Sequence, residues 1–248
     1  MPAPSVTFDG VSKRYGSTAA VDAVSLTIEA GSFVALVGRS GSGKSTLLKT
    51  INRLVEPSAG RVLIDGADVA AGPAAALRRR IGYVFQHIGL FPHMSVAENI
   101  AIGPRIAGDA APDVARLLDL VELPREVASR DPAALSGGQR QRVGIARALA
   151  PGAKLLLMDE AFGALDPLTR DALGRRLRDL HDELGLTTIL VTHDMAEALL
   201  LATRVVVMDF GRVVADETPH ALLAGSGGEQ AQALVAVPRE QAQRIAAL

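Results

Sequence analysis

The segment GRSGSGKST at 38–46 constrains this chain more than any other part of its sequence. It matches the pattern G-x-x-x-x-G-K-[ST] and follows the apolar run FVALV at 33–37, which is typical of a strand buried on both faces. Glycines let backbone N–H groups surround a phosphate, and a helix N-terminus adds partial positive charge. The pattern predicts a strand, a nucleotide-phosphate loop and a helix. The expected binding residues are Gly38, Arg39, Ser40, Gly41, Ser42, Gly43, Lys44, Ser45 and Thr46.

Two side chains of this loop have separate predicted tasks. The Lys44 ammonium reaches the β and γ phosphates, and the Ser45 hydroxyl is a ligand of Mg²⁺. The alternative, an accidental glycine turn, is rare when a buried strand precedes the motif and a helix follows it.

A second apolar run, KLLLMDE at 154–160, ends in the acids Asp159 and Glu160. In phosphate-loop proteins an Asp at the end of a neighbouring strand holds Mg²⁺. Side chains alternate along a strand, so Glu160 can take a separate task, accepting a proton from the attacking water or orienting it. The alternative is a pair of solvated acids. Beside a phosphate loop, the sequence favours Asp159 as a metal ligand and Glu160 as a catalytic base.

The segment LSGGQRQR at 135–142 places two glycines at an expected helix start. Ser136 and Gln139 fit a capping box, so an ordinary capped helix is one interpretation. Capping alone does not require two glycines in the first turn, where they weaken a helix. Gly137 and Gly138 would instead leave backbone N–H groups open to an anion.

Composition narrows the class of protein and its location. The chain has 248 residues, and its 26 basic and 27 acidic side chains give no general reason to bind nucleic acid or anionic lipid. The absence of cysteine excludes disulfides and thiol catalysis. No apolar run approaches the ~18 residues of a transmembrane helix, and MPAPSVTFDG does not resemble a signal peptide. We therefore expect a cytoplasmic chain that works at a membrane only by docking onto another protein.

Periodicity predicts an α/β protein with an inserted helical part. The pattern is helical without strands from about 88 to 150, and GSGG at 225–228 predicts a flexible link before a short helix that follows Pro238. Elsewhere strands alternate with helices in the rhythm of a parallel sheet. The expected strands are short ones over 5–36, a hairpin at 61–69 around Asp65-Gly66, 81–86, 154–158, 187–191 and 204–208, with helices at about 44–54, 167–184 and 194–202.

In order, these features resemble the ATPase subunit of ABC transporters. The resemblance covers about residues 5–225 and rests on GRSGSGKS, Gln86, LSGGQ, LLLMDE, Asp166 and His193. It implies a P-loop NTPase fold with a RecA-like parallel sheet core, an N-terminal antiparallel β-subdomain and an inserted α-helical subdomain at about 88–150. An ATPase domain would span 1–225, and 226–248 would form a short linker and helix. ATP and Mg²⁺ are the implied cofactors.

The resemblance also explains the second glycine pair. In such ATPases two subunits pair head to tail, and each ATP lies between the phosphate loop of one chain and the LSGGQ of the other. Ser136, Gly137, Gly138 and Gln139 would then belong to the partner's site. The implied partners are a second copy of the chain, membrane permease subunits and, indirectly, a substrate-binding protein, at the cytoplasmic face of the membrane.

Four further residues take roles from the resemblance. Tyr15 in VSKRYG matches the aromatic side chain that stacks on adenine, with a locally packed strand-end tyrosine as the alternative. Gln86 matches the glutamine that approaches Mg²⁺ and the water, and His193 in VTHD matches the histidine that contacts the γ-phosphate. A surface glutamine and a structural histidine are the alternatives. Asp166 in GALDP matches a loop that crosses the dimer interface, or it simply caps the helix that starts near Pro167.

One position departs from the family pattern. The residue after the catalytic glutamate is usually proline, and here it is Ala161. Alanine removes the restriction that proline places on φ, so Glu160 is held less rigidly by its local sequence.

Exporters of this family usually carry membrane helices, and the members that act in translation or DNA repair carry two cassettes or a long coiled-coil insertion. This sequence has one cassette, no membrane helix and no heptad repeat, which favours an importer subunit. KTINRLVEPSAGRVLIDG at 49–66 and the segment 78–101, which contains IGLFPH, resemble importers of the quaternary amines glycine betaine, choline and carnitine. IGLFPH lies where family members grip a permease helix, so it can vary with the permease instead of the cargo. Residues after 225 are too few for the paired CBS domains of many such ATPases. The alternatives are an importer of another small solute such as an amino acid or phosphonate, a non-transport regulatory ATPase, or another phosphate-loop enzyme such as a small-molecule kinase.

Overall fold

Two sheets share one buried interface in this protein, whose computed structural model describes residues 2–86, 88–163 and 165–247. The antiparallel sheet has the strand order β2-β1-β4-β5, formed by β1 (Val6–Tyr15), β2 (Thr18–Ile28), β4 (Ala59–Ile64) and β5 (Ala67–Asp68). The larger sheet has the order β10-β9-β3-β8-β7-β6, formed by β3 (Phe33–Val37), β6 (Ile81–Val84), β7 (Leu155–Asp159), β8 (Thr187–Val191), β9 (Arg204–Asp209) and β10 (Arg212–Glu217). All its pairings are parallel except β9 with β10.

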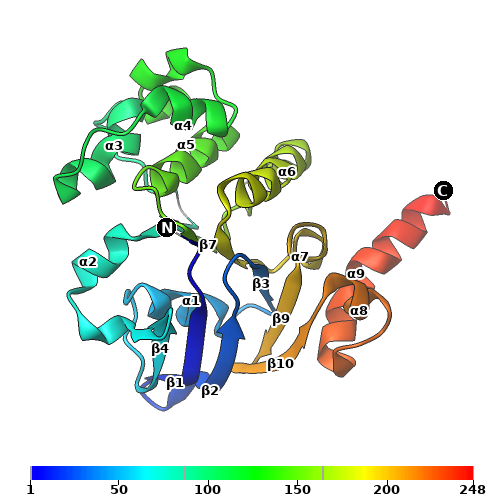
Figure 1. Ribbon diagram of the computed structural model, residues 1–248. Helices are drawn as coiled ribbons and strands as arrows, with labels where there is room; N and C mark the ends of the chain where they lie inside the picture. The colour runs from blue at the N-terminus through cyan, green and yellow to red at the C-terminus, as the bar shows by residue number, and fades with distance from the viewer. Residues whose placement is uncertain (1, 87, 164, 248) are drawn as a thin grey trace.

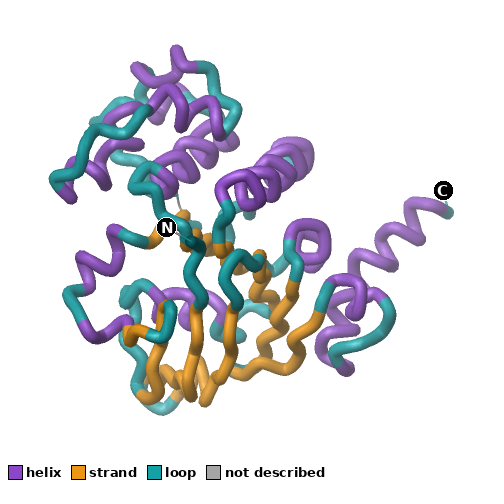
Figure 2. Tube along the Cα trace, viewed as in Figure 1, coloured by secondary structure: helices purple, strands orange, loops and turns teal. Residues whose placement is uncertain are grey.

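Helices cover the larger sheet and form a separate group at one end. Figure 1 shows α3, α4 and α5 together at the top of the view, away from the antiparallel sheet at the bottom, and Figure 2 shows the same separation of helix from strand. None of the helices in the described residues combines the length and apolar character needed to cross a bilayer. The helices are α1 (Lys44–Ile51), α2 (Ala74–Arg79), α3 (Val96–Ala107), α4 (Val114–Leu120), α5 (Gly137–Leu149), α6 (Pro167–Leu184), α7 (Met195–Leu201), α8 (Pro219–Leu223) and α9 (Gly228–Ala246), with 3₁₀ turns at 69–71, 125–129 and 132–134.

Strand β3 divides the hydrophobic core because its side chains alternate between two faces. Phe33, Ala35 and Val37 pack into a cluster with the inner faces of α3–α7 and α9. Val34 and Leu36 pack into a second cluster with α1 and the antiparallel sheet. All five side chains are buried, which explains why this strand is apolar throughout instead of alternating.

The expected α/β architecture, with a parallel core, an N-terminal antiparallel sheet and inserted helices, is confirmed. The hairpin around Asp65-Gly66 forms, with Ile64 opposite Ala67. Three elements were not expected from the sequence: helices α2 and α8, and strand β10, which adds an antiparallel edge to the sheet.

The C-terminal segment differs from the expected flexible link and short helix. Helix α9 begins at Gly228 and continues through Pro238 to Ala246. Its first half packs against the rest of the protein, because Ala231 and Val235 are fully buried in the hydrophobic cluster that contains Phe33. A proline inside a helix costs about 3 kcal/mol, since it removes one hydrogen bond and crowds the preceding turn. The buried turn before Pro238 offsets this cost, and the rest of α9 extends away from the body (Figure 1).

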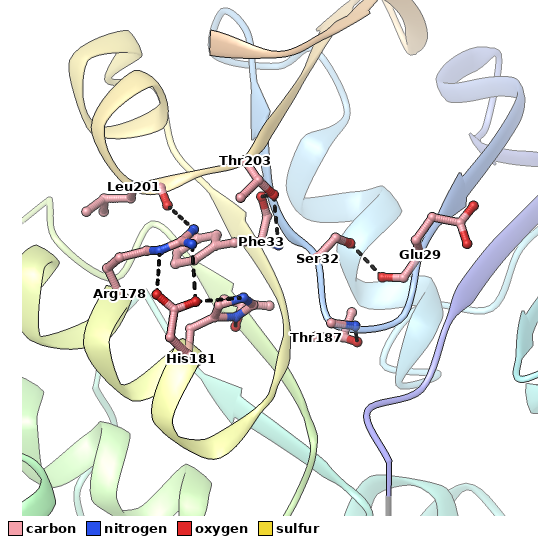
Figure 3. Close-up of polar contacts among 11 residues, drawn as sticks. Glu29, Ser32, Phe33, Arg178, His181, Thr187, Leu201 and Thr203 are labelled. Atoms are coloured by element: carbon pink, nitrogen blue, oxygen red, sulfur yellow. Dashed lines mark hydrogen bonds and ion pairs between the residues drawn. The ribbon is translucent and has the colours of Figure 1, made fainter. Parts of the chain in front are cut away.

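A buried histidine lies on α6 beside strands β3 and β8. His181 Nδ1 is 3.0 Å from Thr188 Oγ1, and its ring centroid is 5.2 Å from that of Phe33. Arg178 lies over the same Phe33 ring and binds Asp182 through two hydrogen bonds (Figure 3). Burial, followed by the charge of Arg178, lowers the pKa of His181.

Candidate active site

The phosphate loop lies between the carboxyl end of β3 and the start of α1. Its glycines are required by backbone geometry, with φ of 148° at Gly38 and 99° at Gly43. A Cβ at Gly38 would lie 2.1 Å from Met208 O, and one at Gly43 would lie 2.1 Å from Ala20 O. Neither position has room for a side chain, because backbone atoms of β9 and β2 close against the loop.

The Lys44 side chain folds back over this loop. Its Nζ donates hydrogen bonds of 2.9 Å to the carbonyl oxygens of both Gly38 and Arg39. Burial lowers the pKa of Lys44, while the nearby charges of Glu160 and Asp159 raise it. The ammonium is thus held against the backbone at Gly38 and Arg39, where a nucleotide phosphate would replace the carbonyl oxygens as its hydrogen-bond partner.

The remaining loop residues differ in accessibility. Arg39, Ser40 and Gly41 are exposed, whereas Ser42 is buried. Thr46 is half-buried in the first turn of α1. The loop therefore has an open side formed by residues 39–41, through which an anion can reach the backbone N–H groups.

Three polar side chains surround the Asp159 carboxylate at the end of β7. Ser45 Oγ donates a 2.6 Å hydrogen bond to Asp159 Oδ1, as the two predicted metal ligands should if they share a site. Lys49 Nζ lies 2.8 Å from the other carboxylate oxygen, and the Tyr83 hydroxyl donates to it at 3.3 Å. Burial and the charge of Asp159 raise the pKa of Tyr83 far above its usual range.

Lys49 and Tyr83 are functional candidates that sequence reasoning missed. Lys49 is one helical turn after Ser45 on α1, and this spacing was the available signal for a shared face. Tyr83 is on β6, which neighbours β7, and only the strand order brings it beside Asp159.

The residues fit a magnesium ion. Ser45 and Asp159 present a hydroxyl and a carboxylate to the same point, and Mg²⁺ binds through one or two protein oxygens plus water and substrate phosphates. The described residues contain no cluster of three acidic or histidine ligands, so the nucleotide itself would supply the other ligands.

Three predicted catalytic side chains meet beyond the ends of β6, β7 and β8. Gln86 Nε2 donates a 3.0 Å hydrogen bond to Glu160 Oε2, and His193 Nδ1 lies 3.7 Å from the same oxygen. Glu160 has a φ of 47°, an uncommon left-handed conformation, and its N–H donates to Val191 O on β8. The structure joins Gln86 to Glu160, and no direct contact of Gln86 with Asp159 is among the hydrogen bonds of the described residues.

Ala161, which replaces the usual proline, is fully packed. Only 3% of it is exposed, in the main core beside Phe162. The strained φ of Glu160 is therefore held by core packing on one side and by the Val191 carbonyl on the other, without a proline.

Tyr15 ends strand β1 at an accessible edge. Its side chain is 53% exposed, and Lys13 Nζ lies 5.2 Å from its ring centroid. Tyr15 pairs with Thr18 in the hairpin, whose second strand reaches the phosphate loop at Ala20. An exposed aromatic ring near the phosphate loop can stack on a nucleobase.

The LSGGQ segment forms the N-terminus of α5 and contains the capping box that its sequence suggested. Ser136 and Gln139 form the reciprocal capping box, with hydrogen bonds of 3.2 and 3.0 Å. A Cβ at Gly137 would meet only open space, whereas one at Gly138 would lie 2.4 Å from Thr169 Cγ2. Gly138 is thus needed for close packing against α6, and only Gly137 leaves its surroundings open.

This segment is separate from the other candidate residues. Among the described residues, no hydrogen bond or ion pair links Ser136, Gly137, Gly138 or Gln139 to the phosphate loop, Asp159 or Glu160.

Asp166 caps helix α6. Its side chain accepts a 3.0 Å hydrogen bond from the Thr169 N–H, and hydrogen bonding by Thr169 lowers the pKa of Asp166. Pro167 occupies the first position of the helix. Thr169 also contacts Gly138, so one residue touches both the cap of α6 and the start of α5.

Comparison with known proteins identifies relatives of this arrangement. The sequence profile described as "ABC transporter" matches residues 21–163. The "Carnitine transport ATP-binding protein OpuCA" of Listeria monocytogenes is 48% identical over 87% of this chain and 56% of that protein. The "Glycine betaine uptake system ATP-binding protein YehX" of Escherichia coli is 49% identical over 88% and 72%, respectively. The "Sulfate/thiosulfate import ATP-binding protein CysA" of Caulobacter vibrioides is 50% identical over 84% and 63%. The chain thus spans 56–72% of the length of these three relatives.

Solved structures share the fold. One described as "Dimeric structure of a post-hydrolysis state of the ATP-binding cassette MJ0796 bound to ADP and Pi" is 34% identical, with a TM-score of 0.77 over 86% of this chain and 98% of that one. CbiO1 of Clostridium perfringens, part of the transporter complex cbiONQ, is 30% identical, with a TM-score of 0.81 over 90% and 91%.

Proposed function

This chain belongs to the ABC transporter family, and we propose that it is the ATP-hydrolysing subunit of an importer whose membrane permease is a separate chain. The family's cassette takes ATP and Mg²⁺ as cofactors. The observation that carries the proposal is the grouping of Lys44, Asp159 and Glu160 at the carboxyl edge of one parallel sheet. Ligands bind at this edge in open α/β sheets.

ATP binding would begin at the phosphate loop and Tyr15. Lys44 would turn from the loop carbonyls to the β and γ phosphates, and Ser45 with Asp159 would hold Mg²⁺, which neutralises charge that develops on the phosphates. Lys49 pairs with the second oxygen of Asp159, which holds this carboxylate in one orientation. Tyr15 would stack on the base from the neighbouring hairpin.

Glu160 is the proposed general base. Its side chain is only 25% exposed, and Gln86 and His193 both point at one of its oxygens. That arrangement orients the carboxylate, and its second oxygen, which has no hydrogen-bond partner among the described residues, would take the proton of an attacking water. His193, 60% exposed, would meet the γ-phosphate.

The site would be completed by a second copy of this chain, placed head to tail. Ser136, Gly137 and Gln139 lie on the surface of α5 without a link to the phosphate loop of their own chain. This separation supports a role for them, with Gly138, at the partner's γ-phosphate, and Asp166 would contribute at the same interface. The matched relative in its solved form is described as dimeric.

A permease would contact the groove between α3 and the β6 edge. Ile102 and Ile106 of α3, with Tyr83 and Arg79, line a pocket there, and Ile106 is 68% exposed. Phe85 and Phe91 are exposed in the adjoining loop. An apolar surface of this kind is suited to receive a helix of another protein. A subunit docked in this way would sit at the cytoplasmic face of the membrane, with a substrate-binding protein acting only through the permease.

Quaternary amines are the proposed cargo. The support comes from the carnitine and glycine betaine relatives and from the segments INRLVEP and IGLFPH. The Phe91 backbone in IGLFPH is held by Asn99 through hydrogen bonds of 2.7 and 3.1 Å, which fixes a loop beside α3. This loop lies on the surface proposed to bind the permease. Its sequence would therefore be matched to the permease, and it would indicate the cargo only because the permease determines the cargo. A sulfate importer is the second candidate, because a sulfate relative is 50% identical.

Uptake by cells tests the proposal. Cells that carry the wild-type chain or a Glu160→Gln variant would be compared for uptake of labelled choline, glycine betaine and sulfate. Loss of amine uptake alone supports the proposed cargo, and loss of sulfate uptake alone replaces it with the second candidate. Phosphate release by the purified chain without any acceptor excludes a kinase, and release with no effect on uptake of any of the three would favour a regulatory ATPase or another cargo.

A further inference from the structure

The turn that carries His193 is held by the carboxylate of Glu197. Glu197 Oε2 accepts a 2.6 Å hydrogen bond from Thr192 Oγ1, which in turn accepts a 3.0 Å bond from the Asp194 N–H. Thr192 also donates its backbone N–H to Leu36 O on β3. The backbone on both sides of His193 is therefore positioned by Glu197.

The counter-charge of Glu197 comes from another helix. Only 11% of the Glu197 side chain is exposed, and burial raises its pKa. Arg170 on α6 places Nε 3.6 Å from Glu197 Oε1 and a terminal nitrogen 3.6 Å from Asp194 Oδ2. Its other terminal nitrogen donates a 3.0 Å hydrogen bond to Leu165 O. One guanidinium therefore contacts the turn of His193 and the turn that ends at Asp166.

These contacts to Glu197 and Asp194 are longer than hydrogen bonds. Arg170 Nε is buried and has no hydrogen-bond partner among the described residues, which is a costly arrangement for a charged group. A shift of a few tenths of an ångström toward Glu197 would give it one. The position of Arg170 is thus sensitive to small movements of the turn at Leu165.

We propose that Arg170 is a positioning residue that couples the turn at Leu165–Asp166 to His193 through Glu197. The inference rests on the proposed function, in which Asp166 lies at the interface between two copies and His193 meets the γ-phosphate. Arrival of the second copy moves the Leu165–Asp166 turn, and Arg170 passes this movement to the turn of His193. In the described residues, the hydrogen bonds and ion pairs of Arg170 reach neither the phosphate loop nor Asp159. Replacing Arg170 should therefore change the rate of hydrolysis and leave ATP affinity unchanged.

A double-mutant cycle tests this coupling. Single-turnover hydrolysis of labelled ATP, with enzyme in excess, measures even very slow rates for the wild type, Arg170→Gln, His193→Ala and the double variant. We expect Arg170→Gln to slow hydrolysis about tenfold when His193 is present and less than about twofold in the His193→Ala background. The reason is that the effects of substitutions at coupled residues are not additive. ATP affinity should be unchanged, and Arg170→Lys, which keeps the charge, should be intermediate.

Arg175→Gln is the matched control. Arg175 is on the same helix, is 73% exposed and, among the described residues, forms an ion pair only with Asp171, at 2.8 Å, so its replacement should leave the rate unchanged. Equal slowing by Arg170→Gln in both backgrounds, or equal slowing by Arg175→Gln, overturns the coupling. If Arg170→Gln does not fold, Arg170→Lys completes the same cycle. A fully active His193→Ala variant would instead overturn the proposed role of His193.

Discussion

Ser45 and Asp159 are 114 positions apart in the sequence, and a 2.6 Å hydrogen bond joins their side chains. Ser45 lies in the first turn of helix α1, which follows β3, and Asp159 ends β7, two strands away in the sheet. Their meeting creates an oxygen-rich point directly beside the phosphate loop, and Lys49 balances its charge.

Asp159→Asn should weaken Mg²⁺-dependent hydrolysis on the order of 10²-fold, because the amide keeps the size of the carboxylate but removes its charge. It also removes the negative charge that Lys49 contacts at 2.8 Å. The measurement is ATP hydrolysis by the purified chain as a function of Mg²⁺ concentration. Asp216→Asn is the control, since it removes the same charge from a carboxylate that accepts a 2.6 Å hydrogen bond from Arg204, away from the site. An unchanged Mg²⁺ dependence of Asp159→Asn would contradict the assigned ligand.

Glu160→Gln should lower the rate of hydrolysis by 10²–10⁴-fold, the usual effect of removing a general base. The variant should still bind ATP, because Lys44 and the loop glycines are untouched. ATP binding and phosphate release are measured on the same preparation, with size-exclusion chromatography to detect an ATP-stabilised dimer. Wild-type turnover in this variant would remove Glu160 from its proposed role.

The two glycines of LSGGQ should respond differently to alanine. Gly138→Ala should destabilise the fold by about 1–3 kcal/mol, since the new Cβ would lie 2.4 Å from Thr169 Cγ2. Thr169→Ser removes this methyl group and should restore most of the loss in the double variant. Gly137→Ala, with open space at its Cβ, should keep or slightly raise stability. Urea unfolding measures all four, and equal effects at both glycines would contradict the packing explanation.

Protonation of His181 should destabilise the protein in mild acid. Burial lowers the pKa of His181 in the fold, whereas the unfolded chain takes up a proton near pH 6.5. The unfolded state therefore binds more protons below that pH, and the free energy of unfolding falls as pH decreases, by up to about 1.4 kcal/mol per unit. The reduction should be smaller in His181→Gln between pH 7.5 and 5.5. His220→Gln, at an exposed position, should keep the wild-type slope in urea unfolding.

Local sequence was enough to predict the elements that carry the candidate site. The pattern around Lys44 needs only a strand, glycines and a helix start, and these are properties of consecutive residues. The acids at 159–160 and the capping box of Ser136 with Gln139 are likewise short-range, and the capping box formed as the sequence suggested. The spacing of apolar residues within each segment predicted strands that alternate with helices, and this alternation predicted the α/β fold. Such spacing can be recognised from consecutive residues alone.

Contacts between distant elements were decided only by the tertiary structure. The order of strands places Tyr83 beside Asp159, and helix packing places Thr169 against Gly138 and Arg170 between two turns. Helix α9 continues through Pro238 because the turn before it is buried, although local propensity predicts a break. The sequence by itself determined which local elements form and which chemical groups they carry. The packing of distant elements decided which groups meet, since burial and close contact depend on residues that periodicity cannot pair.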